Sequence, residues 1–242
     1  MARTFKALSA LLGYPSTLLQ EAVPELAAAI DGEALLATAA RRQLDPLLNE
    51  IATGDLYDLQ ERYVQLFDRT RSLSLHLFEH VHGEGRDRGQ AMIDLQALYE
   101  NGGLKIDAAE LPDFLPLFLE FLSTRPAAEA CELLGQPAHI FAALAERLHQ
   151  RQSPYEGVFH GLVALAAAKP EADEVSALLS TPDPESTDLA ALDAAWEDEP
   201  VIFGPNASNS CRDGLVARIR AGRRPAPGVA TADAAPSALP RS

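Results

Sequence analysis

The residues with the clearest potential for chemistry are His76, Glu79 and His80, which form an H-x-x-E-H pattern. On an α-helix the two histidines lie one turn apart on the same face, with the glutamate close to them. Two imidazoles can bind Zn²⁺ while a carboxylate acts as general base, as in one class of zinc hydrolases. One interpretation is therefore a zinc-dependent hydrolase. The other is a helix with hydrogen-bonded or half-exposed histidines, on which His82 would point away from His80.

The glycine-rich segment 83–89 is a second candidate, because such loops can bind phosphate. It lacks both the spacing and the preceding strand that the nucleotide-binding motifs require, so the sequence predicts a helix–helix connection there. Arginines gather around this segment and form a basic neighbourhood: Arg69, Arg71, Arg86 and Arg88. They could pair with the acidic C-terminal part of the chain or with an acidic partner, and the sequence does not separate these alternatives.

The two cysteines, Cys131 and Cys211, lie in different regions of the chain. Two cysteines cannot form a disulfide framework or a four-cysteine zinc site. Neither has neighbours typical of a thiol with a lowered pKa, and no Gly-x-Ser-x-Gly nucleophile motif is present. We therefore expect both cysteines to be buried or idle and not nucleophilic.

Charge narrows the range of partners. The chain has 20 Lys and Arg against 35 Asp and Glu, a net charge of −15. This charge disfavours nucleic acids and anionic membrane surfaces and favours a basic partner, although it could serve solubility alone. The apolar runs, such as Gly161–Ala168, are too short to span a bilayer, and Ala7–Leu12 is too short for a signal peptide. We therefore expect a cytoplasmic protein with no membrane insertion.

Composition predicts an all-α fold. Leucine and alanine supply 79 of the 242 residues, whereas valine, isoleucine and threonine supply only 25. Apolar residues recur with helical spacing, and glycine or proline separates most of the segments. We expect a single bundle of about eight to ten helices, with segments at 5–12, 35–51, 56–67, 92–99, 111–123, 127–134, 138–151 and 155–168.

The C-terminal part has a different character. Residues 171–200 hold ten acidic residues, and no Lys or Arg lies between Lys169 and Arg212. We expect a helical body over 1–170 and an acidic arm over 171–203, with a possible short docking helix that includes Leu189, Leu192 and Trp196. Residues 204–242 are predicted to be a flexible tail, disordered from about residue 225.

The segment 111–122 is apolar around nearly its whole circumference, so it forms either central core or the wall of an apolar groove. Asp113 and Glu120 are exceptions within it. A carboxylate in an apolar setting needs a partner, and a basic peptide could supply one.

Several blocks of this chain resemble the nitrate reductase molybdenum-cofactor assembly chaperones, the delta-subunit family, which belongs to the all-helical redox-enzyme maturation chaperones. The resemblance extends from about residue 3 to residue 203. The blocks that carry it are Tyr63–Asp68, Ser74–Gly83, Arg86–Met92, Leu111–Pro116, Ala195–Glu197 and Pro200–Phe203.

The resemblance implies an all-α chaperone that is not part of the finished enzyme. Such a chaperone is not itself an enzyme and has no resident metal or cofactor. It would bind the apo catalytic (α) subunit of respiratory nitrate reductase, chiefly through its basic N-terminal segment. It would keep that subunit competent for cofactor insertion and membrane assembly. An acidic protein with an apolar helix flanked by carboxylates fits such a client, because a cationic amphipathic helix can lie in an apolar groove.

The resemblance also implies which residues bind the peptide. The family's Tyr-x-x-Leu-Phe element falls on Tyr63, Leu66 and Phe67, and its second element falls on Pro112, Asp113 and Phe114. Asp113 and Glu120 would meet basic residues of the client. The wider chaperone group often has Asp-His at the second element, where this chain has Asp-Phe. Leu66 and Phe67 also fit the core stripe of their own helix, so both roles stay open.

Overall fold

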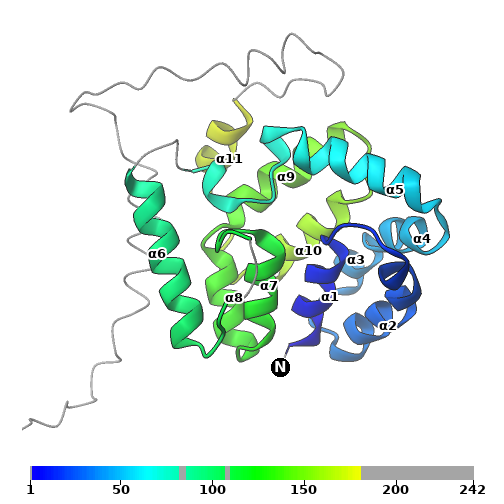
Figure 1. Cartoon of the computed structure of the whole chain (residues 1–242), viewed down its shortest axis with the longest axis horizontal. Helices are drawn as coiled ribbons and strands as arrows, with labels where there is room; N and C mark the ends of the chain where they lie inside the picture. The colour runs from blue at the N-terminus through cyan, green and yellow to red at the C-terminus, as the bar shows by residue number, and fades with distance from the viewer. Residues whose placement is uncertain (1, 82–85, 107–109, 181–242) are drawn as a thin grey trace, which may run out of the picture.

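The computed structural model describes residues 2–81, 86–106 and 110–180. The expected docking helix after Leu189 and the expected tail from 204 lie outside these residues. The described elements are α1 (Arg3–Leu11), α2 (Thr17–Glu33), α3 (Thr38–Arg42), α4 (Asp45–Thr53), α5 (Leu56–Tyr63), the π-helical turn η1 (Val64–Asp68), the 3₁₀ turns η2 (Arg71–Leu73) and η3 (Leu77–Glu79), α6 (Arg86–Asn101), α7 (Leu115–Ser123), α8 (Ala127–Gly135), α9 (Ala138–Gln150), α10 (Glu156–Leu165) and α11 (Ala172–Leu179) (Figure 1).

The prediction of an all-α fold is confirmed. The described ranges contain no strand, only an isolated antiparallel bridge between His76 and Phe114. Several helices end where the sequence predicts: α1 before Gly13, α4 at Gly54 and α6 before Gly102. None of the helices within the described ranges combines the length and the hydropathy that crossing a bilayer requires.

Helix α2 is not among the segments that hydrophobic spacing indicated. Ser16 caps its first turn by accepting a hydrogen bond from the Leu19 amide at 3.2 Å, and Ala34 ends it in a left-handed conformation with φ of 51°. Its fully buried residues are few, namely Leu19, Val23 and Ile30, and Pro24 lies inside it. The buried stripe is therefore too sparse for periodicity alone to reveal.

Helix α7 begins at Leu115 rather than at residue 111. Proline is favoured in the first turn of a helix, and Pro116 lies there. The Leu115 amide donates to the Leu75 carbonyl at 2.9 Å, which ties the start of the helix to a distant loop. Residues 111–114 therefore form a loop before the helix instead of its first turn.

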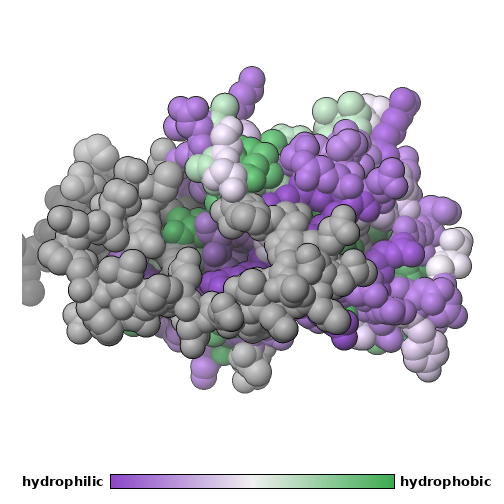
Figure 2. Space-filling view, turned by 90° about the horizontal axis from the view of Figure 1, so that it is seen from above, coloured by the Kyte–Doolittle hydropathy of each residue, from purple (hydrophilic) through white to green (hydrophobic). Residues whose placement is uncertain are grey.

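The core lies where α1 packs between α2 and α7, and where α9 packs on α10 and α11 (Figure 1). Phe5, Leu8 and Leu11 of α1 are fully buried against this core. The guanidinium of Arg147 on α9 donates to the carbonyls of Ser72 and Leu178, both at 2.7 Å, and so links α11 to the body. The residues just after the boundary expected at 170 thus pack on α9. Seen from above, the described surface is mostly hydrophilic, with small hydrophobic areas (Figure 2).

Gly157 sets how closely α10 approaches the end of α3. A Cβ atom at this position would lie 2.0 Å from the carbonyl oxygen of Gln43, which is backbone and cannot rotate away. We expect Gly157→Ala to lower the free energy of unfolding by about 1–3 kcal/mol, as overpacking does. Chemical denaturation followed by circular dichroism measures this change.

Gly161 on the same helix is the matched control. A Cβ there would meet only the side chain of Leu36 at 3.8 Å, an ordinary contact. Gly161→Ala should be neutral or stabilise the protein by up to about 1 kcal/mol, because alanine is the better helix former. Equal effects of the two substitutions would contradict a close approach at Gly157.

Candidate functional site

The Tyr-x-x-Leu-Phe element lies at the end of α5 and in the π-helical turn η1, with its side chains directed inward. The Tyr63 hydroxyl donates to the carbonyl of Leu12 at 2.8 Å. Its ring packs against Tyr14, Phe67 and Tyr155, with centroid distances of 5.5, 5.0 and 6.3 Å. Leu66 and Phe67 are buried in the same core. All three residues therefore lie beneath the surface.

A π-helical turn, η1, continues α5 at this point. The Arg69 amide donates to the Val64 carbonyl at 3.0 Å, five residues back, and the Thr70 hydroxyl donates to the Gln65 carbonyl at 2.9 Å. Such widened turns occur often at functional sites, because they re-aim side chains out of the regular helical register. Here the turn leaves Val64 and Gln65 half-buried above the inward-facing Leu66 and Phe67.

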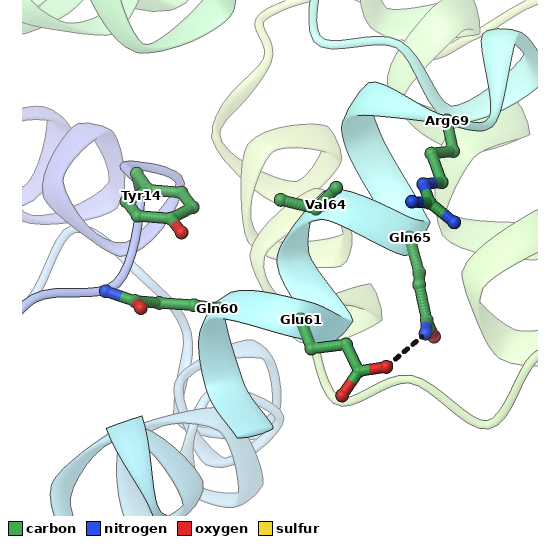
Figure 3. A pocket seen from close by; sticks show the side chains of 6 residues that line it. All are labelled: Tyr14, Gln60, Glu61, Val64, Gln65 and Arg69. Carbon is green, nitrogen blue, oxygen red and sulfur yellow. Dashed lines mark hydrogen bonds between the residues drawn. The ribbon is translucent and has the colours of Figure 1, made fainter. Parts of the chain in front are cut away.

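A shallow pocket of about 190 Å³ opens beside this turn (Figure 3). Tyr14 from the loop after α1 lies across from Val64, and Gln65 donates to Glu61 at 3.1 Å. We call this pocket and its lining residues the α5–η1 surface; they are Tyr14, Gln60, Glu61, Val64, Gln65 and Arg69. It combines apolar contact from Tyr14 and Val64 with one carboxylate, two amides and the guanidinium of Arg69.

The second predicted element is a loop that pairs with the segment after η2. The Leu77 amide donates to the Asp113 carbonyl at 3.0 Å, and the Pro112 carbonyl accepts from the Tyr99 hydroxyl at 2.7 Å. The ring of Phe114 lies over that of His76, with centroids 5.3 Å apart. The chain between η1 and η3 thus links the two predicted elements.

Asp113 lies at the centre of this pairing and is 0% exposed. Its carboxylate accepts from the Phe78 amide at 3.0 Å and lies 3.1 Å from Nδ1 of His76. A buried carboxylate needs such partners, because removing an ionised group from water is costly. In this conformation the partners of Asp113 are groups of this chain, and its carboxylate does not reach solvent.

Nearby carboxylates affect the pKa values of His76, which contacts the second element, and of Tyr63 in the first. The hydrogen bond that the Asp113 carboxylate accepts from His76 raises the pKa of His76, whereas burial lowers it. The negative charges of Asp113, Glu79 and Glu110 raise this pKa further. Burial raises the pKa of Tyr63, with smaller contributions from Tyr155, Asp68 and Glu110. The negative charge of Glu110 therefore acts on both elements.

The H-x-x-E-H pattern does not form the helical metal site that its spacing suggested. His76 lies in an extended conformation before the short 3₁₀ turn η3, so it does not share a helical face with His80. Nε2 of His80 lies 2.8 Å from the Ser74 carbonyl, and burial lowers the pKa of this histidine. No group of three metal-ligating side chains occurs among the residues that the structure describes, and His82 lies outside them. The zinc hydrolase interpretation is not favoured.

The remaining predicted residues have partners within the chain. Glu120 on α7 forms an ion pair with Lys6 on α1, at a partly exposed position. Arg88 on α6 lies 3.5 Å from Glu79. The structure therefore joins the Tyr63 and Asp113 elements through one loop and places Glu120 on the α1–α7 surface.

Sequence reasoning missed most of the residues that line the pocket. Tyr14 lies just after the predicted helical segment 5–12, between Gly13 and Pro15, where no motif marks it, and an aromatic residue in such a turn can remain exposed. Val64 and Gln65 fall between the motif residues, on the outward side of the stripe that Tyr63, Leu66 and Phe67 form. Their neighbours Gln60 and Glu61 carry no motif signal of their own.

The chain matches the family described as "Nitrate reductase delta subunit" over residues 16–160. It is 43% identical over 208 residues to the nitrate reductase molybdenum cofactor assembly chaperone NarJ of Escherichia coli, covering 86% of this chain and 87% of that protein. It is 40% identical over 206 residues to the probable chaperone NarW of the same species, with 85% and 86% covered. A probable chaperone NarJ of Bacillus subtilis is 33% identical over 165 residues, with 66% and 86% covered.

The family match over residues 16–160 covers both predicted elements and the residues of the α5–η1 surface other than Tyr14. The matches define the class of protein as an assembly chaperone for a molybdoenzyme, and not a catalytic enzyme. The chain belongs to the nitrate reductase delta subunit family.

The pair of His76 and Asp113 makes stability depend on pH. In the folded protein the pKa of His76 is raised above its ordinary value of 6.5. Its contribution to the free energy of unfolding is therefore fully present below pH 6.5 and is lost as the pH rises through the folded pKa. We expect the stability difference between wild type and His76→Gln to be larger at pH 6 than at pH 9. Urea denaturation of both proteins across this range measures it.

His80 provides a comparison of opposite sign. The pKa of His80 is lower in the folded protein than in the unfolded chain. As the pH falls below about 6.5, His80 therefore becomes protonated in the unfolded chain before it does in the folded protein, and wild type loses stability. The difference between wild type and His80→Gln should therefore shrink on acidification. Parallel pH profiles for the two substitutions would show that the Asp113 interaction does not govern His76.

Proposed function

We propose that this protein binds the apo catalytic subunit of respiratory nitrate reductase in the cytoplasm and keeps it competent for molybdenum cofactor insertion and membrane assembly. It does so without becoming part of the finished enzyme. The observation that supports this proposal most strongly is the family match over residues 16–160. A chaperone of this kind needs a surface for an unfinished client and no reacting groups.

The client segment in this proposal is the basic N-terminal segment of the catalytic subunit, and it binds at the α5–η1 surface. Val64 and the ring of Tyr14 offer apolar contact there, above the rigid layer of Tyr63, Leu66 and Phe67. An amphipathic helix can lay its apolar face on such a surface. Buried apolar anchors then supply most of the affinity.

Carboxylates around this surface favour a cationic client. Glu61 and Asp68 are exposed on α5 and η1, and Glu110 is exposed near the second element. Their attraction for basic residues speeds encounter and sets orientation, and salt screens it. This combination predicts binding that weakens with salt without being abolished.

The second element has a supporting role in the proposal. Asp113 holds the loop of Pro112 and Phe114 against His76, so it acts on the client through the loop's shape. Phe114 is only half-buried and offers a second apolar contact beside the ring of His76. Glu120 takes part only where its ion pair with Lys6 opens.

We expect the double substitution Glu61→Lys and Asp68→Lys to weaken binding of a synthetic peptide with the client's N-terminal sequence by about tenfold at low salt. Each reversal removes an attraction and adds a repulsion of up to about 1 kcal/mol. The effect should shrink at 0.3 M salt. Calorimetric titration of the purified full-length protein measures both affinities.

The matched control is Glu129→Lys with Glu132→Lys, two exposed carboxylates on α8. It changes the net charge by the same amount, so only the local effect differs. Its affinity should stay within about twofold of wild type. Equal losses from the two pairs would mean that the peptide responds to net charge and does not bind at the α5–η1 surface.

A further inference from the structure

Exposed apolar side chains gather at the corner where α2 and α5 begin. Tyr14, Leu18 and Tyr57 are 53%, 75% and 80% exposed, and they are three of the six large apolar residues exposed among the described residues. Two glutamine side chains join the start of α2 to the start of α5 at this corner. Gln60 donates to the Pro15 carbonyl and Gln20 to the Gly54 carbonyl, both at 2.9 Å. Tyr14 also lines the pocket, so the corner is continuous with the α5–η1 surface.

The charges around this corner are mostly negative. Helix α2 contains no Lys or Arg and exposes Glu21 and Glu25. On α5, Asp58 and Glu61 are acidic, while Arg62 forms an ion pair with Glu50. An apolar surface with this surrounding charge suits a polypeptide segment that is both basic and apolar.

This chain contains such a segment in its own C-terminal part. Residues 212–224 hold five of the chain's 20 Lys and Arg residues and a single acid, Asp213, so their net charge is +4 in a protein of −15. Leu215, Val216 and Ile219 are apolar residues within the same stretch. The segment is therefore both basic and apolar, which suits the corner and the α5–η1 surface.

The chain is long enough to bring this segment to the surface. The described part ends at Ser180, and 31 residues lie between Ser180 and Arg212. At about 3.3 Å per residue they can span up to about 100 Å, more than the width of a body of this size. Tethering also gives the segment an effective concentration on the order of millimolar, so even a weak intrinsic affinity suffices.

We propose that the segment Arg212–Arg224 docks on the α5–η1 surface and the adjoining corner when no client is present. A client's basic segment must displace it, so the two segments compete for the same surface. This inference rests on the proposed function for the identity of the displacing client. Docking of the segment itself depends only on the charges and apolar residues of this chain.

Cross-linking from Cys211, which directly precedes the segment, locates it in the full chain. The protein carries Cys131→Ala, so that a benzophenone maleimide reacts only at Cys211. After irradiation, mass spectrometry should find links to peptides that contain residues 14–18 and 57–65, and excess client peptide should suppress them. Links only to the acidic residues 183–199, or only between isotopically distinguished copies, would overturn intramolecular docking on this surface.

Affinity for the client peptide gives an independent test. The triple substitution Leu215→Ser, Val216→Ser and Ile219→Ser leaves the net charge unchanged and removes the apolar contacts of the segment. In the full chain it should tighten client binding by about two- to tenfold, as loss of a tethered competitor does. The control Ala217→Ser with Ala221→Ser should leave the affinity unchanged, and equal affinities of all three proteins would overturn the proposal.

The two experiments separate this inference from the proposed function. Cross-links to the corner without any client binding would support docking of the segment and contradict the proposed client site. Client binding that charge reversal at Glu61 and Asp68 weakens, with no cross-link to the corner, would support the client site and overturn the docking.

Discussion

The buried carboxylate of Asp113 is the constraint on which the rest of the site depends. A charged group with no solvent access must be satisfied by its own chain, and the Phe78 amide and His76 satisfy it here. These contacts hold an irregular segment, with only short 3₁₀ turns, against the loop before α7. Because that segment follows η1 directly, its position also sets where the π-helical turn lies relative to α7.

The polar residues that first suggest catalysis are used for structure instead. Nδ1 of His76 is engaged by Asp113, Nε2 of His80 lies at the Ser74 carbonyl, and Glu79 lies beside Arg88. Groups held in this way fix loops that have few other regular contacts. This use of titratable residues agrees with membership of a family of assembly chaperones.

The proposed binding surface at α5 and η1 is built in two layers. A rigid aromatic group of Tyr63, Phe67 and Tyr155 lies below, and half-buried residues such as Val64 lie above it. Such support keeps an apolar area open at the surface without the collapse that would bury it. Surrounding carboxylates add long-range attraction that salt can screen, which suits a partner that must later be released.

The fold class, most helix positions and the family can be predicted from the sequence, since amphipathic spacing and local motifs are properties of neighbouring residues. Helices α1, α9 and α10 follow their apolar stripes closely. It did not reveal α2, whose buried face is sparse, nor the later start of α7. It also left open whether Leu66 and Phe67 belong to the core or to a groove.

The roles of the polar residues depend on contacts between distant parts of the chain, which the sequence does not reveal. His76 and Asp113 are 37 positions apart, so no local pattern predicts their contact. The H-x-x-E-H spacing suggested a metal site because it assumes a helix, and long-range hydrogen bonds hold that stretch in another conformation. Likewise, Tyr14 and Val64 meet at one pocket only because the loop after α1 packs against the end of α5, where the Tyr63 hydroxyl donates to the Leu12 carbonyl. Spacing along the chain reports local geometry, and the partners of a buried charge are set by the whole fold.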